Sequence, residues 1–79
     1  MKVKLFAHLQ TEAGCGEIEL SPAGKITADE LWQMLDGKIP GITRHKNSTR
    51  VAKNYVYTTL DETFSDADEI ALIPPVSGG

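Results

Sequence analysis

Hydrophobic and polar residues alternate with a period of two at the start of the chain. Between Lys2 and Leu9, every second position is apolar, namely Val3, Leu5, Ala7 and Leu9. This alternation predicts a strand over residues 2–9 with one buried face. Phe6 stands on the opposite face, so we expect it to pack under a second layer or to form part of a partner surface.

A second strand is predicted at Glu17–Leu20, where Ile18 and Leu20 align on one face, after a glycine-rich turn at residues 13–16. The two strands are expected to form a hairpin. The glycines resemble a phosphate-binding loop only superficially, because the Gly-Lys-Ser continuation and a following helix are missing. Cys15 is interpreted as an incidental thiol, since no neighbour in the sequence would activate it.

The clearest helix signal begins at Thr27. Thr27 and Glu30 have the spacing of a capping box, and Ile26 and Leu31 have that of a hydrophobic staple. These signals predict that a helix starts directly after Thr27.

One face of this helix is expected to cover the sheet, because Leu31, Met34 and Leu35 recur at i, i+3 and i+4. Gly37 is the predicted end of the helix. Trp32 lies off the apolar stripe, and we expect it to be partly buried at the helix edge.

Residues 41–49 are polar and include Arg44, His45 and Lys46. We interpret them as a solvated connection; the alternative is a basic patch, extended by residues 50–53, that docks an acidic partner or a phosphorylated substrate. His45 is not expected to bind a metal, because His8 is the only other histidine and no cysteine pair exists.

Short strands and turns are predicted for the remainder of the chain. A third strand covers residues 50–54, and residues 55–57 either continue it or form another short strand; residues 60–64 stay open between a helical turn and a strand. A polar turn is predicted at residues 65–68.

The last strand, Glu69–Ile73, is apolar on both faces, which is typical of a central strand. Ile70 and Leu72 point one way, and Ala71 and Ile73 the other, so Ile73 and Phe6 could share an uncovered, partner-binding face. The order strand, strand, helix, strands predicts an α+β domain with a mixed sheet packed on one main helix. If the first and last strands are parallel neighbours, the fold is a β-grasp.

Length and composition restrict the function. Seventy-nine residues are enough for a single domain, residues 1–79, with one core. The net charge of -3 does not favour nucleic acid, and the single cysteine fits a reducing compartment. We expect a cytoplasmic protein, because no stretch resembles a signal segment or reaches membrane-spanning length.

The chain ends in an extended segment, residues 74–79, whose sequence is Pro74-Pro75-Val76-Ser77-Gly78-Gly79. The prolines stiffen its start, and the two glycines offer no side chain that would block a narrow channel. Six extended residues reach roughly 20 Å. We therefore expect a flexible Gly-Gly tail whose working group is the carboxylate of Gly79.

An ionised carboxylate is a poor electrophile and must first be activated, most directly as an acyl-adenylate made with ATP. A sulfur donor could then displace AMP and leave a thiocarboxylate. The chain offers no convincing base, metal or phosphate site of its own, so we expect a non-catalytic carrier without bound cofactor, and partners that supply the catalysis.

The stretch from Asp68 to Gly79 resembles the C-terminal signature of the small subunits of molybdopterin synthase, a family of ubiquitin-like β-grasp sulfur carriers. The resemblance extends loosely over the whole chain. It implies that an E1-like adenylating enzyme activates Gly79 and that a sulfur donor protein provides the sulfur. It also implies a heterotetramer with the large subunit, where the tail delivers sulfur to cyclic pyranopterin monophosphate in molybdenum cofactor biosynthesis. Phe6 and Ile73 fall where such proteins place apolar partner contacts.

Three other functions remain open. A sulfur carrier for thiamin synthesis or tRNA thiolation would use the same chemistry at Gly79. We rank this function second, mainly because of the Pro74-Pro75-Val76 stretch. A ubiquitin-like modifier would join Gly79 to a lysine through an isopeptide bond. A β-grasp interaction domain would have an inert tail.

Overall fold

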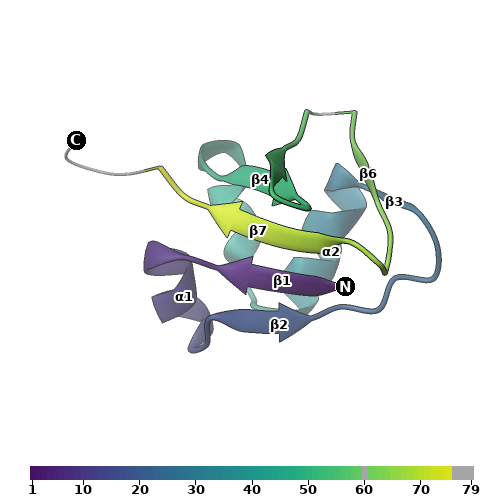
Figure 1. The fold of residues 1–79 in the computed structure, drawn as a ribbon. Helices are drawn as coiled ribbons and strands as arrows, with labels where there is room; N and C mark the ends of the chain where they lie inside the picture. Colours follow the sequence, from purple (N-terminus) through teal and green to yellow (C-terminus); the bar gives the residue numbers. More distant parts are fainter. Residues whose placement is uncertain (60, 76–79) are drawn as a thin grey trace.

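The structure, a computed structural model, describes residues 1–59 and 61–75. A five-stranded mixed sheet has the strand order β2-β1-β7-β4-β5, and α2 packs across one of its faces (Figure 1). The sheet consists of β1 (Lys2–Leu5), β2 (Glu17–Glu19), β4 (Arg50–Lys53), β5 (Val56–Tyr57) and β7 (Glu69–Ile73). A separate two-stranded pair is formed by β3 (Ile26–Thr27) and β6 (Thr63–Phe64). The helices are α1 (Ala7–Ala13), α2 (Ala28–Lys38) and the 3-10 helix η1 (Ile42–Ser48).

The first and last strands are parallel neighbours in the middle of the sheet. Val3 is paired with Ile70 and Leu5 with Leu72, while β4 runs antiparallel on the other side of β7. This arrangement confirms the predicted α+β, β-grasp fold and the central position of Glu69–Ile73.

The core lies between α2 and the sheet. Leu31 and Leu35 from α2 are fully buried, as are Ile70 and Leu72 from β7. The predicted apolar stripe is therefore correct. Trp32 was expected to be partly buried, but it is only 3% exposed and belongs to the core, because η1 and β4 cover the edge of α2 on that side.

The predicted start of α2 is confirmed. Thr27 N donates to Glu30 Oε1 over 2.9 Å, and Glu30 N donates to Thr27 Oγ1 over 3.2 Å, which completes the capping box. The helix runs one residue past Gly37 to Lys38, within the usual uncertainty of helix ends.

The predicted strand over residues 2–9 is wrong beyond Leu5, because the chain turns into α1. Ala7 has a positive φ of 52°, and the helix is capped by Gly14, which has a φ of 77° and whose N–H donates to Gln10 O over 3.0 Å. Leu9 is fully buried in the core from this helix. The expected β1–β2 pairing exists, but a helix connects the strands in place of a tight turn.

The connection at residues 41–49 is more ordered than a solvated loop, since most of it forms η1, which the fully buried Ile42 anchors in the core. Residues 54–55 form a turn, and residues 56–57 form β5, which confirms the alternative of a separate short strand. Residues 60–64 were expected to form either a helical turn or a strand, and the strand is correct for residues 63–64, which form β6. Leu60 lies outside the described residues.

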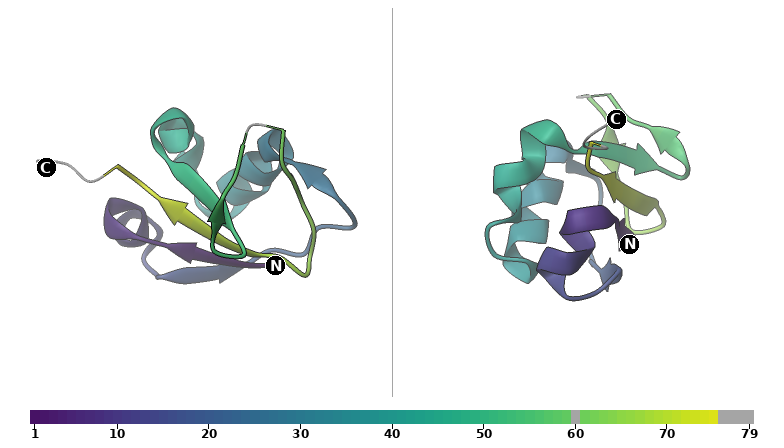
Figure 2. Two further views of the ribbon diagram at one scale, coloured as in Figure 1. Left: turned by 45° about the horizontal axis from the view of Figure 1, so that its top comes forward. Right: turned by 90° about the vertical axis from the view of Figure 1, so that its left-hand side faces the viewer.

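The turn at residues 65–68 is confirmed by a hydrogen bond from Asp68 N to Ser65 O over 3.0 Å. Two further views show the helices gathered on one side of the sheet and the other face open (Figure 2). No helix within residues 1–59 and 61–75 is long and apolar enough to cross a membrane.

Candidate functional site

The uncovered face of the sheet leads to the point where the tail leaves the domain. Strand alternation in β7 buries Ile70 and Leu72 completely and leaves Ala71 and Ile73 partly exposed on the other face. Ile73 is the last residue of β7, so the outward face of the central strand ends where the chain continues into Pro74.

Phe6 and Ile73 come together because of the register of the central strands. Leu5 is paired with Leu72 in parallel register, so the next residue of each strand is at the same level. Phe6 is in extended conformation before α1 begins, and its side chain is 43% exposed. The structure thus places both residues that the sequence suggested for partner contacts in one groove.

This groove, which we call the sheet groove, has a volume of about 310 Å³. Its lining is mainly apolar and comprises Lys4, Phe6, Ala52, Tyr55, Tyr57, Glu69, Ile70, Ala71 and Ile73. A groove of this kind can receive an apolar side chain from another protein.

One edge of the sheet groove is charged. The Nζ atom of Lys4 lies 3.4 Å from Glu69 Oε2. A hydrogen bond from Tyr55 lowers the pKa of Glu69, desolvation opposes this shift, and the charges of Lys4 and Lys2 reinforce it. Glu69 is therefore an ionised, internally satisfied group, and it is not placed to act as a base.

Of the six tail residues, the structure describes two. Pro74 is buried and Pro75 is exposed, so the chain leaves the domain within these two residues. Val76, Ser77, Gly78 and Gly79 lie outside the described residues.

The basic stretch at residues 44–53 is largely neutralised by carboxylates of the same chain. Arg44 and His45 both pair with Glu12 on α1, the latter through Nε2 and Oε2 at 3.0 Å. Lys46 pairs with Asp29, and Lys53 Nζ lies 3.0 Å from Glu62 Oε2. These pairs connect η1 and β4 to their neighbours, which favours a connecting role over a free basic patch.

The two histidines are neighbours, with the ring centroids of His8 and His45 4.9 Å apart. Among the described residues, however, no group of three or more potential ligands could hold a metal ion. Cys15 is an exposed free thiol, and Gly14 serves as the cap of α1.

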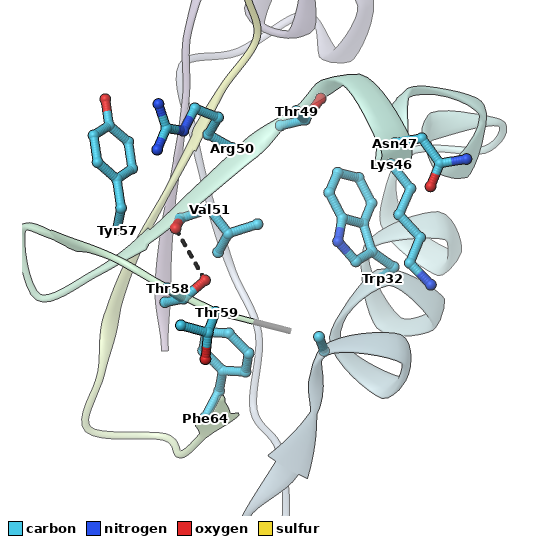
Figure 3. Close-up of a pocket in the computed structure, with 11 residues that line it drawn as sticks. Trp32, Lys46, Asn47, Thr49, Arg50, Val51, Tyr57, Thr58, Thr59 and Phe64 are labelled. Atoms are coloured by element: carbon cyan, nitrogen blue, oxygen red, sulfur yellow. Dashed lines mark hydrogen bonds between the residues drawn. The ribbon is translucent and has the colours of Figure 1, made fainter. Parts of the chain in front are cut away.

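A second cavity, of about 370 Å³, lies on the helix side of the sheet between α2, η1 and β4 (Figure 3). Trp32 and Phe64 contribute apolar lining, Lys46 lines the cavity from η1, and Arg50 lines it from β4, beside Tyr57. Thr58 Oγ1 donates to Val51 O over 3.0 Å in its lining. The lining contains no cysteine, histidine or carboxylate among the described residues.

Sequence reasoning missed Tyr55 and Tyr57, which line the sheet groove together with Phe6. The signal was present, since the Tyr-Val-Tyr run is unusually apolar for a turn and short strand. The exposure of this run depends on the turn at residues 54–55, which the sequence did not indicate.

A model of the ThiS family matches residues 3–79 of the chain. The molybdopterin synthase sulfur carrier subunit of Arabidopsis thaliana is 32% identical over 79 residues, covering 100% of this chain and 82% of the relative. The human protein of the same name is 30% identical over 82 residues, covering 100% and 93%. Small archaeal modifier protein 1 of Haloferax volcanii is 31% identical over 87 residues, covering all of both chains. A crystal structure of this archaeal protein superposes with a TM-score of 0.86 at 32% identity, covering 100% of this chain and 98% of the other.

Proposed function

The chain belongs to the ThiS family, and from this premise we propose that it is a sulfur carrier whose working group is the carboxylate of Gly79. The observation that carries the proposal is the position of the sheet groove at the base of the tail. Ile73 ends β7 in this groove, and Pro74 begins the tail. A partner that binds the groove would therefore receive the tail beside its binding surface.

The chemistry follows from the state of the carboxylate. With a pKa near 3.5 it is ionised at neutral pH and must be activated. A carboxylate oxygen attacks the α-phosphorus of ATP on an E1-like enzyme, and pyrophosphate leaves. Hydrosulfide can then displace AMP and give the thiocarboxylate of Gly79 directly. Alternatively, the terminal sulfur of a persulfide on a donor protein displaces AMP, and a thiol then reduces the resulting acyl disulfide, which releases the donor and leaves the same thiocarboxylate. The carrier binds no cofactor in this scheme, and ATP belongs to the activating enzyme.

We propose the large subunit of molybdopterin synthase as the acceptor partner. The plant and human relatives are named sulfur carrier subunits of that enzyme, and this chain aligns with them over its full length. The thiocarboxylate sulfur would attack cyclic pyranopterin monophosphate in the large subunit's active site, and hydrolysis of the resulting thioester would leave the sulfur on the pterin and return the carboxylate of Gly79. Because a dithiolene needs two sulfurs, the carrier must dissociate and be recharged, so we expect a reversible interface.

A ubiquitin-like modifier is the second candidate, favoured by the full-length similarity to small archaeal modifier protein 1. Its chemistry shares the adenylation of Gly79 but ends in an isopeptide bond to a lysine. Both candidates use the same tail and the same activating step.

Intact mass spectrometry after incubation with an E1-like enzyme, ATP and sulfide tests the proposal. We expect the mass gain of one oxygen replaced by sulfur, located at Gly79. Adding the large subunit and the pterin precursor should then discharge the thiocarboxylate. A stable conjugate to lysine would favour the modifier, and an unchanged mass with a competent enzyme would contradict both candidates.

A further inference from the structure

The α-amino group of Met1 donates hydrogen bonds to three acceptors of the same chain. Its nitrogen lies 2.8 Å from Leu20 O, 2.8 Å from Asp66 Oδ1 and 3.1 Å from Glu19 Oε2. A protonated amine at a chain end has three N–H donors, so these acceptors satisfy the group completely. Two of the acceptors are carboxylates, and both form ion pairs with the terminal charge.

Two separate parts of the fold bring these acceptors to the amine. Glu19 is the last residue of β2, and the following Leu20 N donates to Met1 O over 2.9 Å. Asp66 belongs to the turn at residues 65–68, which the hydrogen bond from Asp68 N to Ser65 O closes. Met1 is only 4% exposed and is part of the core, so the amine cannot leave this site without disturbing buried packing.

These contacts favour the protonated form of the amine. The hydrogen bond to Asp66 contributes most to raising the pKa of the Met1 α-amino group; burial opposes the rise, and the hydrogen bond to Glu19 and the charges of both carboxylates reinforce it. Only the neutral amine has a lone pair, and that lone pair takes the place of one N–H. Attack on an electrophile therefore requires the loss of both a proton and one of the three hydrogen bonds.

The reactivity of this amine matters because the proposed carrier passes through an acyl-adenylate, which amines attack. An unperturbed terminal amine has a pKa near 8 and a lysine amine one near 10.4, so at neutral pH the neutral fraction of the former is more than about a hundred times larger. An exposed chain end would thus be the amine most ready to react. Its nitrogen would bond to the carbonyl carbon of Gly79, AMP would leave with the bonding electron pair, and the amine would release a proton.

The product of this reaction would join two copies of the chain. β1 and β7 are parallel, and Lys2 at the start of β1 is paired with Glu69 at the start of β7. Met1 therefore lies at one end of the central strands, and the chain leaves β7 after Ile73 at the other end (Figure 1). The activated end of one copy meets the N-terminus of another copy more readily than its own, and an amide would link them head to tail.

We infer that the site formed by Glu19, Leu20 and Asp66 keeps the Met1 amine unreactive and thereby prevents the activated carrier from acylating the N-terminus of a second copy. The adenylate of Gly79 is then preserved for the sulfur donor, although every copy carries an amine at its own chain end. The inference rests on the proposed function, because only a chain that is activated at Gly79 needs this protection.

Acetylation with acetic anhydride at pH 7 tests the protection without any enzyme. The rate at the Met1 amine, followed by mass spectrometry of the N-terminal fragment, is compared with the rate in a peptide of residues 1–5, whose amine has none of the three acceptors. We expect the folded protein to react at least about tenfold more slowly, because one hydrogen bond to a charged group is worth that factor. Asp66→Ala should raise the rate towards that of the peptide. Asp61→Ala, which removes an exposed carboxylate that makes none of the contacts of Met1, should leave the rate unchanged.

Activation without a sulfur source tests the consequence. With the E1-like enzyme and ATP alone, Asp66→Ala should form a species of twice the chain mass less one water, joined from Gly79 to Met1, and the wild type should not. Equal acetylation rates for the wild type and the peptide would overturn the inference, and this comparison decides even if Asp66→Ala does not fold. A wild-type dimer joined through Met1, or a folded Asp66→Ala that forms none, would overturn it too.

The two proposals fail in different ways. A wild type that acquires sulfur but whose Met1 amine reacts as fast as the peptide would contradict the inference alone. A wild type whose Met1 amine is protected but whose Gly79 is never activated by a competent enzyme would contradict the proposed function, and the site would then serve only the stability of the fold.

Discussion

The side-chain amide of Asn54 donates a hydrogen bond of 3.0 Å to the carboxylate of Asp68, which joins the β4–β5 turn to the turn before β7. The other carboxylate oxygen of Asp68 accepts a hydrogen bond of 2.8 Å from Ser65 N. A single carboxylate therefore positions two turns that lie far apart in the sequence. This contact is one of three hydrogen bonds through which Asn54 holds the turn that carries Tyr55.

Acid should weaken this connection. Burial alone would raise the pKa of Asp68, but the hydrogen bonds from Ser65 and Asn54 and the charge of Lys53 outweigh it, so the pKa is lowered. A carboxyl whose pKa is lower in the folded state adds stability above its unfolded pKa of about 3.9 and loses it as the pH falls through the folded value. We expect Asp68→Asn to lose less stability than the wild type between about pH 5 and pH 2. The difference should be about 1 kcal/mol or less, because the group is only partly buried.

Urea unfolding at a series of pH values measures this effect. Asp61→Asn serves as a control, because Asp61 is an exposed carboxyl that makes none of the contacts of Asp68. Parallel acid profiles for the wild type and Asp68→Asn would show that the carboxylate contributes nothing through its charge.

Phe6→Ala should weaken binding of the large subunit far more than it weakens folding. The ring is 43% exposed, so its removal leaves no closed cavity, and we expect a loss of about 1 kcal/mol or less in the free energy of unfolding. Leu5→Ala is the matched control, since the neighbouring side chain is 2% exposed and its truncation should cost about 2–5 kcal/mol. A cost for Phe6→Ala near 3 kcal/mol would instead place the ring in the core.

Elements that depend on residues close together in the sequence could be predicted, whereas several others could not. The start of α2 follows from Thr27 and Glu30, whose reciprocal hydrogen bonds need only residues three positions apart. The parallel pairing of β1 with β7 is not local, yet the apolar run on both faces of β7 indicated a central strand. The outward positions of Phe6 and Ile73 followed from the same alternation.

The failure at α1 has a specific cause. Leu5 and Leu9 are four residues apart, a spacing that fits alternation and helical periodicity equally well. The turn at Ala7, where φ is positive, decides between them, and alanine gives no sequence signal for it. The left-handed turn at Tyr55 was not predicted for the same reason, because a tyrosine does not indicate such a position.

Truncation of Leu9 tests the position of α1 in the core. Leu9 is fully buried, and we expect Leu9→Ala to cost about 2–5 kcal/mol in the free energy of unfolding. Thr11→Ala, an exposed position on the same helix, should change stability by about 0.5 kcal/mol or less. Equal effects of both substitutions in chemical denaturation would show that α1 does not pack on the core.

Removing Gly79, or adding a residue after it, should abolish sulfur transfer while leaving the melting temperature almost unchanged. The core residues of the described part of the chain belong to the region up to Leu72, and we therefore expect changes at residue 79 to leave the core intact. The activating enzyme, in contrast, is expected to act on the carboxylate of Gly79, and either change removes or displaces that group. Thiocarboxylate formation by intact mass and thermal unfolding of the same samples measure both properties, with Lys38→Ala as a control. Sulfur acquired by the shortened chain would contradict the assignment of Gly79, and a large drop in melting temperature would mean that the tail supports the fold.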